Sequence, residues 1–300
     1  MSPSNTSSDS GERIEDPATV IAFQGAPGAF SEAACVALYP AMTTLPCKTF
    51  SDTFATVTDG RAGLAMIPIE NSAAGRVADI HQLLPESDLH IVAEHFERVR
   101  HNLLALPNAD PAGLTTVRSH VHALSQCRKV IARRGLLPVV HADTAGAAAE
   151  VAVADDPTSA AIASQLAAET YGLAIVEAEV EDEPNNTTRF VVLSRQPLDP
   201  SVGGGPVITS FMFQCRNVPA ALYKCLGGFA TNGVNMTKLE SYMVDGSFSA
   251  TVFFAEVEGH PSELGLGRAL SELDYFSREV RIMGVYPAHP YRREAAANRR

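Results

Sequence analysis

The sequence of 300 residues predicts an α/β region with two lobes, followed by a small α+β domain. From residue 20 onward, short apolar segments of strand length alternate with amphipathic segments rich in Ala and Leu. This order is typical of a largely parallel sheet with crossover helices. Residues 196–206, with three glycines between two prolines, have the composition of a linker. Beyond them the order of elements changes, and 300 residues are more than one ordinary core holds.

The first region, residues 19–195, is expected to form the two lobes. Its strand candidates are residues 20–23, 64–67, 89–93, 103–106, 139–141, 160–163 and 190–193. Its helix candidates are residues 31–38, 123–133, 144–153 and 165–171. The region divides near His101 into halves of the same kind, which predicts two lobes with a cleft between them. The strand at Phe190 is expected to return to the first lobe, because the second lobe offers it nothing further to pair with.

The second region, residues 207–287, is expected to be a separate small domain. Its strand candidates are residues 207–214, 235–244, 248–257 and 280–286, and its helix candidates are residues 220–231 and 261–273. This βαββαβ order is the ferredoxin-like arrangement, and Asp245-Gly246 predicts its hairpin turn. Residues 1–18 are expected to be a disordered leader. Residues 288–300 are expected to be a tail in which Arg299 and Arg300 are solvated.

The composition bounds the class of protein. A hydrophobic content of 46% with 19% charged residues is typical of a globular chain. The net charge of −11 and the absence of a Lys/Arg cluster in the folded region argue against a nucleic-acid partner. No apolar run has transmembrane or signal-peptide character, so no membrane partner is expected. Five cysteines without a C-x-x-C pair indicate reduced thiols in a cytosolic protein. The nine histidines show no ligand spacing, so no metal is expected.

Polar motifs follow two strands of the first lobe. Residues 25–31 include Gly28, Phe30 and Ser31 and open a helix, whose free N–H groups attract an anion. The alternative is an ordinary tight turn between a strand and a helix. In residues 68–72, Glu70 and Asn71 leave a strand end toward the expected cleft mouth, where α/β sheets place ligands. The alternative is that Asn71 or Ser72 caps the next helix.

The second lobe and the returning strand carry further polar residues. Ser119 and Gln126 are seven residues apart and share a helix face, although Ser119 could simply cap that helix. Ser164 repeats the pattern of a serine between a strand and a helix. Residues 182–190 are the most polar segment beside a strand, with Asn186 and Thr188 at their centre. A turn entering the sheet is the alternative reading of that segment.

Taken in order, these motifs resemble those of the prephenate dehydratases over residues 20–287. The matching segments are residues 25–31, residues 68–72 with Gly75, Ser119-His120 with Gln126-Cys127, and Asp182 with Asn186 and residues 188–190. The resemblance implies a two-lobed catalytic domain of the periplasmic-binding-protein type and a C-terminal ACT regulatory domain. It also implies conversion of prephenate to phenylpyruvate, CO2 and water, in which aromatisation drives the reaction without a cofactor.

The resemblance assigns roles to individual residues. Thr188 would hydrogen-bond or protonate the leaving hydroxyl, and Glu70 is the candidate proton source if burial keeps it protonated. Arg189 would supply a charge beside Thr188 or brace the loop. The implied substrate-binding residues are Gly28, Phe30, Ser31, Asn71, Ser72, Ser119, Gln126, Ser164, Asn186, Arg189 and Phe190.

The second region resembles an ACT domain that senses phenylalanine between paired domains, in a homodimer or homotetramer. The implied phenylalanine-binding residues are Pro219, Ala220, Ala221, Leu222, Asn235, Met236, Glu240 and Ser241. The sequence departs from the family at Ala220, where glycine is usual, and at Tyr242-Met243, where Arg-Pro is usual. The domain could instead serve only dimer contacts.

Two alternatives to prephenate dehydratase remain open. Arogenate dehydratase performs the same chemistry on an amino-acid substrate, and a cytosolic sensor would bind a small molecule in the cleft without catalysis. The linker composition further predicts that few contacts join the two regions. A chain ending near Gly203 is therefore expected to fold and to ignore phenylalanine.

Overall fold

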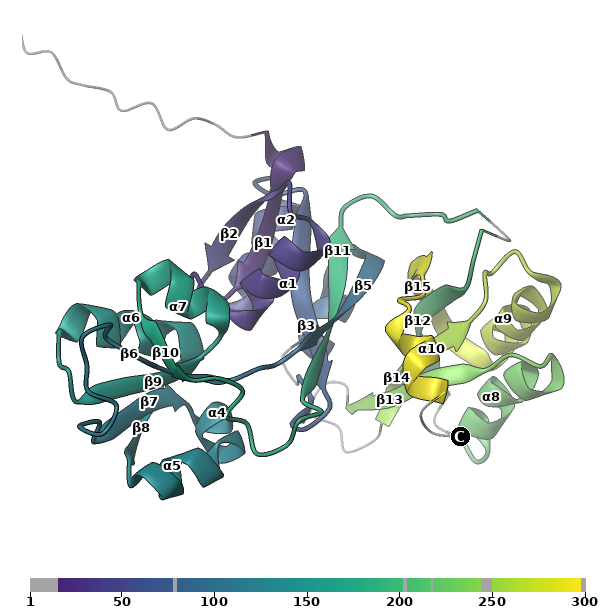
Figure 1. Cartoon of the computed structure of the whole chain (residues 1–300). Helices are drawn as coiled ribbons and strands as arrows, with labels where there is room; N and C mark the ends of the chain where they lie inside the picture. The colour runs from purple at the N-terminus through teal and green to yellow at the C-terminus, as the bar shows by residue number, and fades with distance from the viewer. Residues whose placement is uncertain (1–15, 78–79, 202–203, 217, 244–249, 298–300) are drawn as a thin grey trace, which may run out of the picture.

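The computed structural model describes residues 16–77, 80–201, 204–216, 218–243 and 250–297. These residues form a second lobe, a first lobe and a C-terminal domain, seen from left to right in Figure 1. Each unit is built around its own β-sheet. The predicted disordered leader, residues 1–18, lies mostly outside the described part, although residues 17–19 form a short 3-10 helix.

The first lobe contains a mixed sheet with strand order β2-β1-β3-β11-β5, and β4 beside β3. Its strands are β1 (Val20–Gln24), β2 (Thr43–Cys47), β3 (Leu64–Asn71), β4 (Gly75–Arg76), β5 (His90–Arg98) and β11 (Thr187–Ser194). Strand β11 returns from the second lobe and pairs antiparallel with β3 and β5. The predicted return of this strand is confirmed. The expectation of a largely parallel sheet is wrong at the β3-β11-β5 end of this sheet, because β11 runs antiparallel to both of its neighbours.

Helices cover both faces of the first sheet. Helix α1 (Phe30–Leu38) packs on one face through Ala34 and Cys35. Helices α2 (Phe50–Thr58) and α3 (Ile80–Glu86) pack on the other face. A capping box at Thr49 and Asp52 fixes the start of α2. The sequence patterns did not predict this helix.

The second lobe has a sheet of order β10-β6-β9-β7-β8. Its strands are β6 (Asn102–Ala105), β7 (Thr116–His120), β8 (Leu137–His141), β9 (Ser159–Ala163) and β10 (Ala174–Glu177). Its helices are α4 (Val121–Gln126), α5 (Arg128–Arg134), α6 (Thr144–Ala154) and α7 (Gln165–Tyr171). The single helix expected over 123–133 is broken at Cys127. The Asp182 carboxylate, distant in sequence, accepts from the backbone N–H groups of Arg128 and Lys129 and starts a new helix there.

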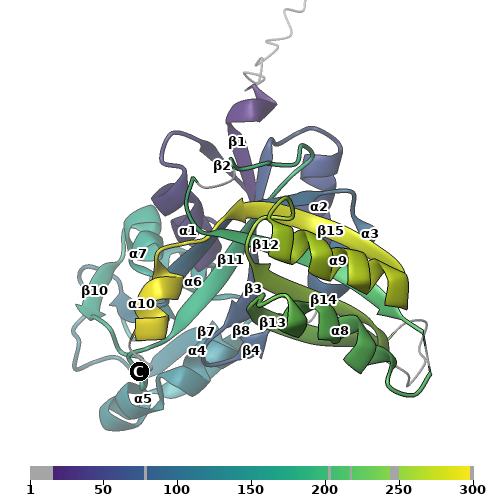
Figure 2. The ribbon, with the colours of Figure 1, turned by 90° about the vertical axis from the view of Figure 1, so that its right-hand side faces the viewer.

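The C-terminal domain has the predicted βαββαβ order. Its elements are β12 (Val207–Cys215), α8 (Ala221–Thr231), β13 (Met236–Met243), β14 (Ala250–Glu258), α9 (Leu264–Phe276) and β15 (Ser277–Pro287). The sheet is antiparallel with order β13-β14-β12-β15, and α8 and α9 cover its outer face (Figure 2). The hairpin turn predicted at Asp245-Gly246 lies outside the described residues.

The inner face of this sheet packs on the first lobe. One hydrophobic core contains Ile91 and Val191 of the first lobe together with Ile208 and Met283 of the C-terminal domain. A Cβ added at Gly284 would collide with the backbone of Ile91, so the glycine permits β15 to lie against β5. The expectation that few contacts cross the linker is therefore wrong, because both domains complete the same core.

The predicted tail also contains structure. Helix α10 (Tyr291–Ala297) lies beside the first lobe, and Tyr291 stacks on Phe96 of β5 with ring centroids 4.6 Å apart. Helix α10 thus occupies part of the predicted tail, residues 288–300. Arg299 and Arg300 lie outside the described residues.

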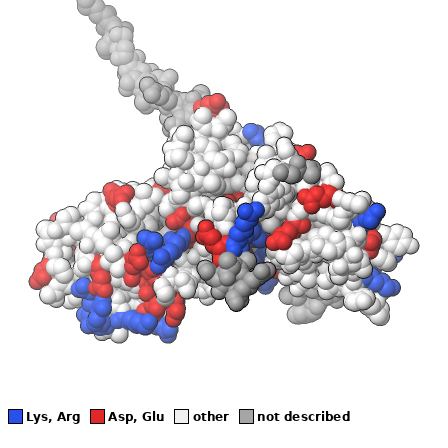
Figure 3. Space-filling model, turned by 45° about the vertical axis from the view of Figure 1, so that its right-hand side comes forward, with Lys and Arg blue, Asp and Glu red and all other residues white. Residues whose placement is uncertain are grey.

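Charges on the surface are mixed in sign. Lys and Arg are interspersed with Asp and Glu on the face seen in Figure 3. Arg133 and Arg134 of the basic helix α5 both pair with Glu177. Within the described ranges, no helix has the length and apolar character needed to cross a bilayer. Nor do the side chains described there include three or more His, Cys, Asp or Glu grouped to hold a metal ion.

Candidate active site

A cleft of about 450 Å³ lies between the two lobes. The first lobe contributes the end of β1, the start of α1, the end of β3 and the start of β11. The second lobe contributes α4 and the start of α6. The lining residues predicted from the sequence are Phe30, Ser31, Asn71, Gln126, Asn186 and Thr188. The lining residues not predicted include His101, His120, His122 and Asp143.

A β-bulge in β3 sets which side chains face this cleft. Arg189 pairs with Glu70, but the next residue, Phe190, pairs with Pro68, so Ile69 is the extra residue on β3. A bulge reverses the alternation of side chains along its strand. Beyond it, Asn71 points to the same face as Thr188, whereas Glu70 points to the same face as Arg189.

Thr188 is held by a single amide. The Oδ1 atom of Asn71 accepts from the backbone N–H groups of Ala73 and Ala74, at 2.9 and 2.8 Å. Its Nδ2 group must therefore be the side that donates to Thr188 Oγ1, at 2.9 Å, and to Asn186 Oδ1, at 2.8 Å. Because Thr188 Oγ1 accepts this bond, its own hydrogen is free to be donated into the cleft.

The hydrogen-bond network extends to a histidine that the sequence patterns did not reveal. Gln126 Oε1 accepts from Asn186 Nδ2 at 2.8 Å and lies 3.0 Å from His101 Nε2. His101 Nε2 must therefore carry the proton, which leaves Nδ1 as an acceptor. Nδ1 is buried and has no hydrogen-bond partner within the described structure. Burial lowers the pKa of His101, although the hydrogen bond that the ring donates to Gln126 opposes this shift, so the ring is neutral near pH 7.

The start of α1 lies at the cleft. Its N-cap, Ala29, makes no side-chain hydrogen bond to the first turn, and Phe30 and Ser31 line the cleft. The free N–H groups and the helix dipole favour a carboxylate there. No Lys or Arg is among the described residues that line the cleft, so its donors are backbone, amide, hydroxyl and imidazole groups.

Several predicted binding residues have other partners. Ser164 Oγ caps α7 and donates to the carbonyl oxygen of Gly28, which joins the two lobes. Ser72 Oγ holds the loop before β11, and Ser119 Oγ donates to Ile162 O at 2.6 Å inside the second lobe. Phe190 is buried in the core against α1. Ser119 is also not the cap of α4, since His120 occupies that position. The residues that line the cleft do not include Gly28, Ser72, Ser119, Ser164 or Phe190.

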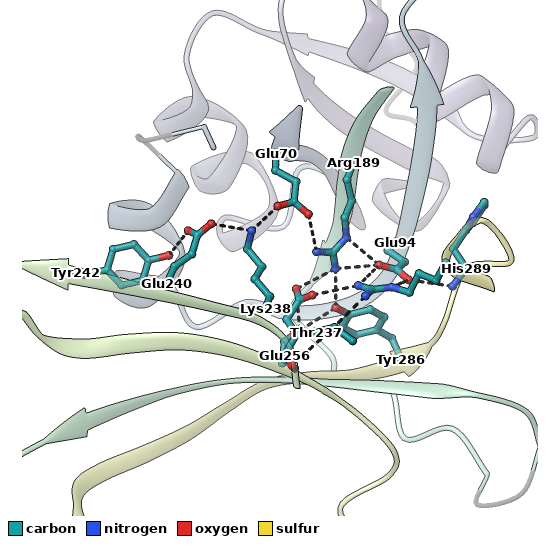
Figure 4. A network of polar contacts seen from close by, with 12 residues as sticks. Glu70, Glu94, Arg189, Thr237, Lys238, Glu240, Tyr242, Glu256, Tyr286 and His289 are labelled. Atoms are coloured by element: carbon teal, nitrogen blue, oxygen red, sulfur yellow. Dashed lines mark hydrogen bonds and ion pairs between the residues drawn. The ribbon is translucent and has the colours of Figure 1, made fainter. Parts of the chain in front are cut away.

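Glu70 and Arg189 lie on the opposite face of the sheet from Thr188. Figure 4 shows both side chains pointing from the first lobe toward the C-terminal domain. Glu70 pairs with Lys238 and with Arg189, and Arg189 is 3% exposed in a network with Glu94 and Glu256. The prediction that these two residues face the cleft is wrong, because adjacent strand residues point to opposite faces.

The residues predicted to bind phenylalanine are placed on different surfaces. Ala220 precedes α8 with a φ of 62°, in the left-handed region that favours glycine, and it is exposed like Pro219. Glu240 lies on the inner face of the sheet, where it pairs with Lys238 and accepts from the hydroxyl of Tyr242. This carboxylate therefore lies on the side of the sheet that faces the first lobe.

Together these features define a two-lobed α/β protein with a small-molecule cleft and a ferredoxin-like domain packed behind it. The prephenate dehydratase family model matches residues 21–198, more than half of the chain. The chain belongs to the prephenate dehydratase family.

Relatives agree with this assignment over most of their length. A bifunctional N-acyl-homoserine lactone acylase/prephenate dehydratase of Komagataeibacter europaeus is 53% identical over 284 residues, which cover 95% of this chain and 99% of the relative. Arogenate dehydratase 3 of Arabidopsis thaliana, a chloroplastic protein, is 38% identical over 89% of this chain and 66% of its own. The crystal structure of prephenate dehydratase from Arthrobacter aurescens in complex with L-Phe has a TM-score of 0.82 at 28% identity. That comparison covers 93% of this chain and 97% of the other.

Proposed function

We propose that the protein converts prephenate to phenylpyruvate, CO2 and water in the cleft between the lobes. The observation that carries this proposal is the pair formed by Asn71 and Thr188. A hydroxyl whose lone pair is occupied by an amide donor presents its hydrogen to the cleft. That is what the departure of a hydroxyl group requires.

The reaction breaks two bonds of the ring. The bond to the ring carboxylate breaks and releases CO2, and its electron pair makes the ring aromatic while the C4–O bond breaks. The leaving oxygen takes one proton, which comes from solvent in the net reaction. Thr188 stabilises the developing charge on that oxygen by hydrogen bonding, and assistance of this kind is worth about 10²–10⁴-fold in rate.

The substrate carboxylates would be held by neutral donors. The first turn of α1 and the Ser31 hydroxyl supply donors from the first lobe. Gln126 supplies its Nε2 group from the second lobe, because its Oε1 atom is occupied by Asn186 and His101. Donors from both lobes would let a bound dianion hold the cleft closed and exclude water, which favours loss of a carboxylate.

The direct test is incubation of the purified full-length protein with prephenate and, separately, with arogenate. We expect the ultraviolet signal of phenylpyruvate from prephenate. Phenylalanine formed from arogenate at a higher kcat/KM would make the protein an arogenate dehydratase instead. Binding of prephenate without any product would make it the non-catalytic sensor.

A second candidate activity is hydrolysis of N-acyl-homoserine lactones. It is favoured by the relative from K. europaeus, whose name includes this acylase and which matches nearly the entire chain. Mass spectrometry of an acyl-homoserine lactone incubated with the protein would detect the free fatty acid and homoserine lactone. Equal hydrolysis by wild type and Thr188→Ala would place that activity apart from the dehydratase centre.

Regulation by phenylalanine is the further part of this proposal. The A. aurescens relative binds L-Phe, and the fold of residues 207–287 fits an ACT-like domain. We expect phenylalanine to bind at the start of α8 and along β13, in a cytosolic homodimer or homotetramer. Calorimetric titration with phenylalanine and sedimentation measurements test these two expectations separately.

A further inference from the structure

The two residues at the centre of the cleft are each next to a residue held by the C-terminal domain. Asn71 follows Glu70 on β3, and Thr188 precedes Arg189 on β11. The bulge at Ile69 makes Glu70 and Arg189 directly opposite partners. Each strand end therefore presents one side chain to the cleft and the next to the C-terminal domain, as Figure 4 shows for Glu70 and Arg189.

Arg189 is fixed firmly. Its guanidinium donates to Glu94 Oε2 and to Glu256 Oε1, both at 2.9 Å, and to Tyr286 OH at 3.2 Å. Arg292 of α10 bonds the other sides of the same two carboxylates, at 2.7 Å and 3.1 Å. Burial alone would lower the pKa of Arg189, but Glu256, Tyr286 and Glu94 raise it, so the group stays charged. Removal of one partner from such a buried network is strongly destabilising, because it leaves a buried charge without compensation.

Glu70 is fixed from the other side by one lysine. Its Oε1 atom is 3.3 Å from Arg189 Nη1, and its Oε2 atom accepts from Lys238 Nζ. Lys238 is also 2.7 Å from Glu240 Oε1, and its side chain is 9% exposed. Burial opposes its charge, but the hydrogen bonds to Glu240 and Glu70 raise the pKa of Lys238. Lys238 thus joins β13 to the end of β3 through an ion pair.

The ion pair between Lys238 and Glu70 is linked to the cleft through few bonds. Glu70 and Asn71 share a peptide bond, and Asn71 Nδ2 donates to Thr188 Oγ1. A shift of Glu70 would turn the end of β3 and with it the amide that orients the threonine hydroxyl. Misplacement of a catalytic group by about 1 Å can cost 10²-fold in rate, so a small displacement at this point is sufficient.

We propose that Lys238 of the C-terminal domain is a positioning residue for the reaction, acting through Glu70 on Asn71 and hence on Thr188. This inference rests on the proposed dehydratase function. It makes the C-terminal domain a structural part of the catalytic site. A ligand that moves β13 would therefore act on Asn71, which holds Thr188, through the ion pair between Lys238 and Glu70.

The test measures kcat and KM for prephenate in the full-length protein. Lys238→Met should lower kcat by about 10- to 100-fold with KM nearly unchanged, and Lys238→Arg should keep most of the rate. Arg281→Met is the matched control, because Arg281 also joins the C-terminal domain to the first lobe, through the carbonyl of Pro85, but touches neither catalytic strand end. Its kcat should stay near wild type.

A second measurement separates positioning from general weakening of the fold. In an Asn71→Ala background, Lys238→Met should lower kcat no further, since the amide on which Lys238 acts is gone. Equal losses in both backgrounds, or a kcat of Lys238→Met equal to that of Arg281→Met, would overturn the inference. A wild-type protein that produces no phenylpyruvate would instead overturn the proposed function.

Discussion

Thr188 depends on Asn71 for its orientation, and the two contacts of Asn71 with Ala73 and Ala74 fix which way the amide points. The sequence motifs predicted both residues correctly as lining the cleft. The motifs could not assign the faces of Glu70 and Arg189. For Arg189, the alternation of side chains along β11 would have been enough to predict a different face from Thr188. For Glu70 it would not, because the bulge at Ile69 reverses the alternation in β3 and leaves no signal in the sequence.

The hydroxyl of Thr188 gives the first prediction at this scale. Thr188→Ala should lower kcat by about two powers of ten, because a donor to the leaving oxygen is lost, while KM changes little. Thr188→Ser keeps the hydroxyl and should keep much of the rate. Steady-state kinetics with prephenate measures both variants. Turnover of the Ala variant close to wild type would remove Thr188 from the chemistry.

His101 gives a prediction about pH. Its pKa is lowered in the folded protein by burial, so the unfolded chain binds a proton at a higher pH than the native state does. The stability from this group is therefore complete above its ordinary pKa, about 6.5, and is lost as the pH falls below it. Melting temperatures recorded across this range should drop for wild type and drop less for His101→Gln. Parallel curves for the two proteins would contradict the assignment.

At the scale of elements, local sequence predicted most strands and helices but not their interruptions. The pattern over 123–133 is helical throughout, and α4 and α5 are separate because a carboxylate at Asp182 caps the second one. Such a break is made by tertiary contact, so no local pattern contains it. The short edge strands β2 and β10 were missed for a related reason, since their pairing partners rather than their composition make them strands.

The turn before α8 gives a prediction at the element scale. Ala220 has a φ of 62°, a conformation that costs an L-residue about 1–2 kcal/mol. Ala220→Gly removes this strain and loses part of the gain through greater freedom of the unfolded chain, about 0.4–1 kcal/mol. The melting temperature should therefore rise by about 2 °C. Gly227→Ala, inside the same helix, is the control for local propensity. A lower melting temperature for Ala220→Gly would contradict the assigned strain.

At the scale of the whole molecule, the linker composition gave a misleading expectation of independence. Residues 196–206 do connect two units with different topologies. The units nevertheless share a core at Ile91, Val191, Ile208 and Met283 and a buried ionic network. The composition of a linker shows only that the chain passes between two units. Whether the units pack together depends on the apolar faces of their sheets, and the sequence does not show that these faces meet.

Truncation tests this sharing. A chain ending near Gly203 should yield little soluble protein, because it exposes the apolar face of the first sheet and leaves Arg189 without Glu256. Cleavage of the full-length protein at a protease site inserted into residues 196–206 is the control. The two fragments should elute together on size exclusion. Fragments that separate, with a folded first fragment, would restore the independent domains expected from the sequence.

The central claim is that this cleft removes CO2 and water from prephenate with Thr188 at its centre. The most direct measurement follows phenylpyruvate and CO2 together when the full-length wild-type protein and Thr188→Ala are each incubated with prephenate. We expect equal amounts of the two products from wild type, formed about 100-fold faster than by the variant. Prephenate that binds to wild type and is recovered unchanged, or equal rates for the two proteins, would contradict the claim.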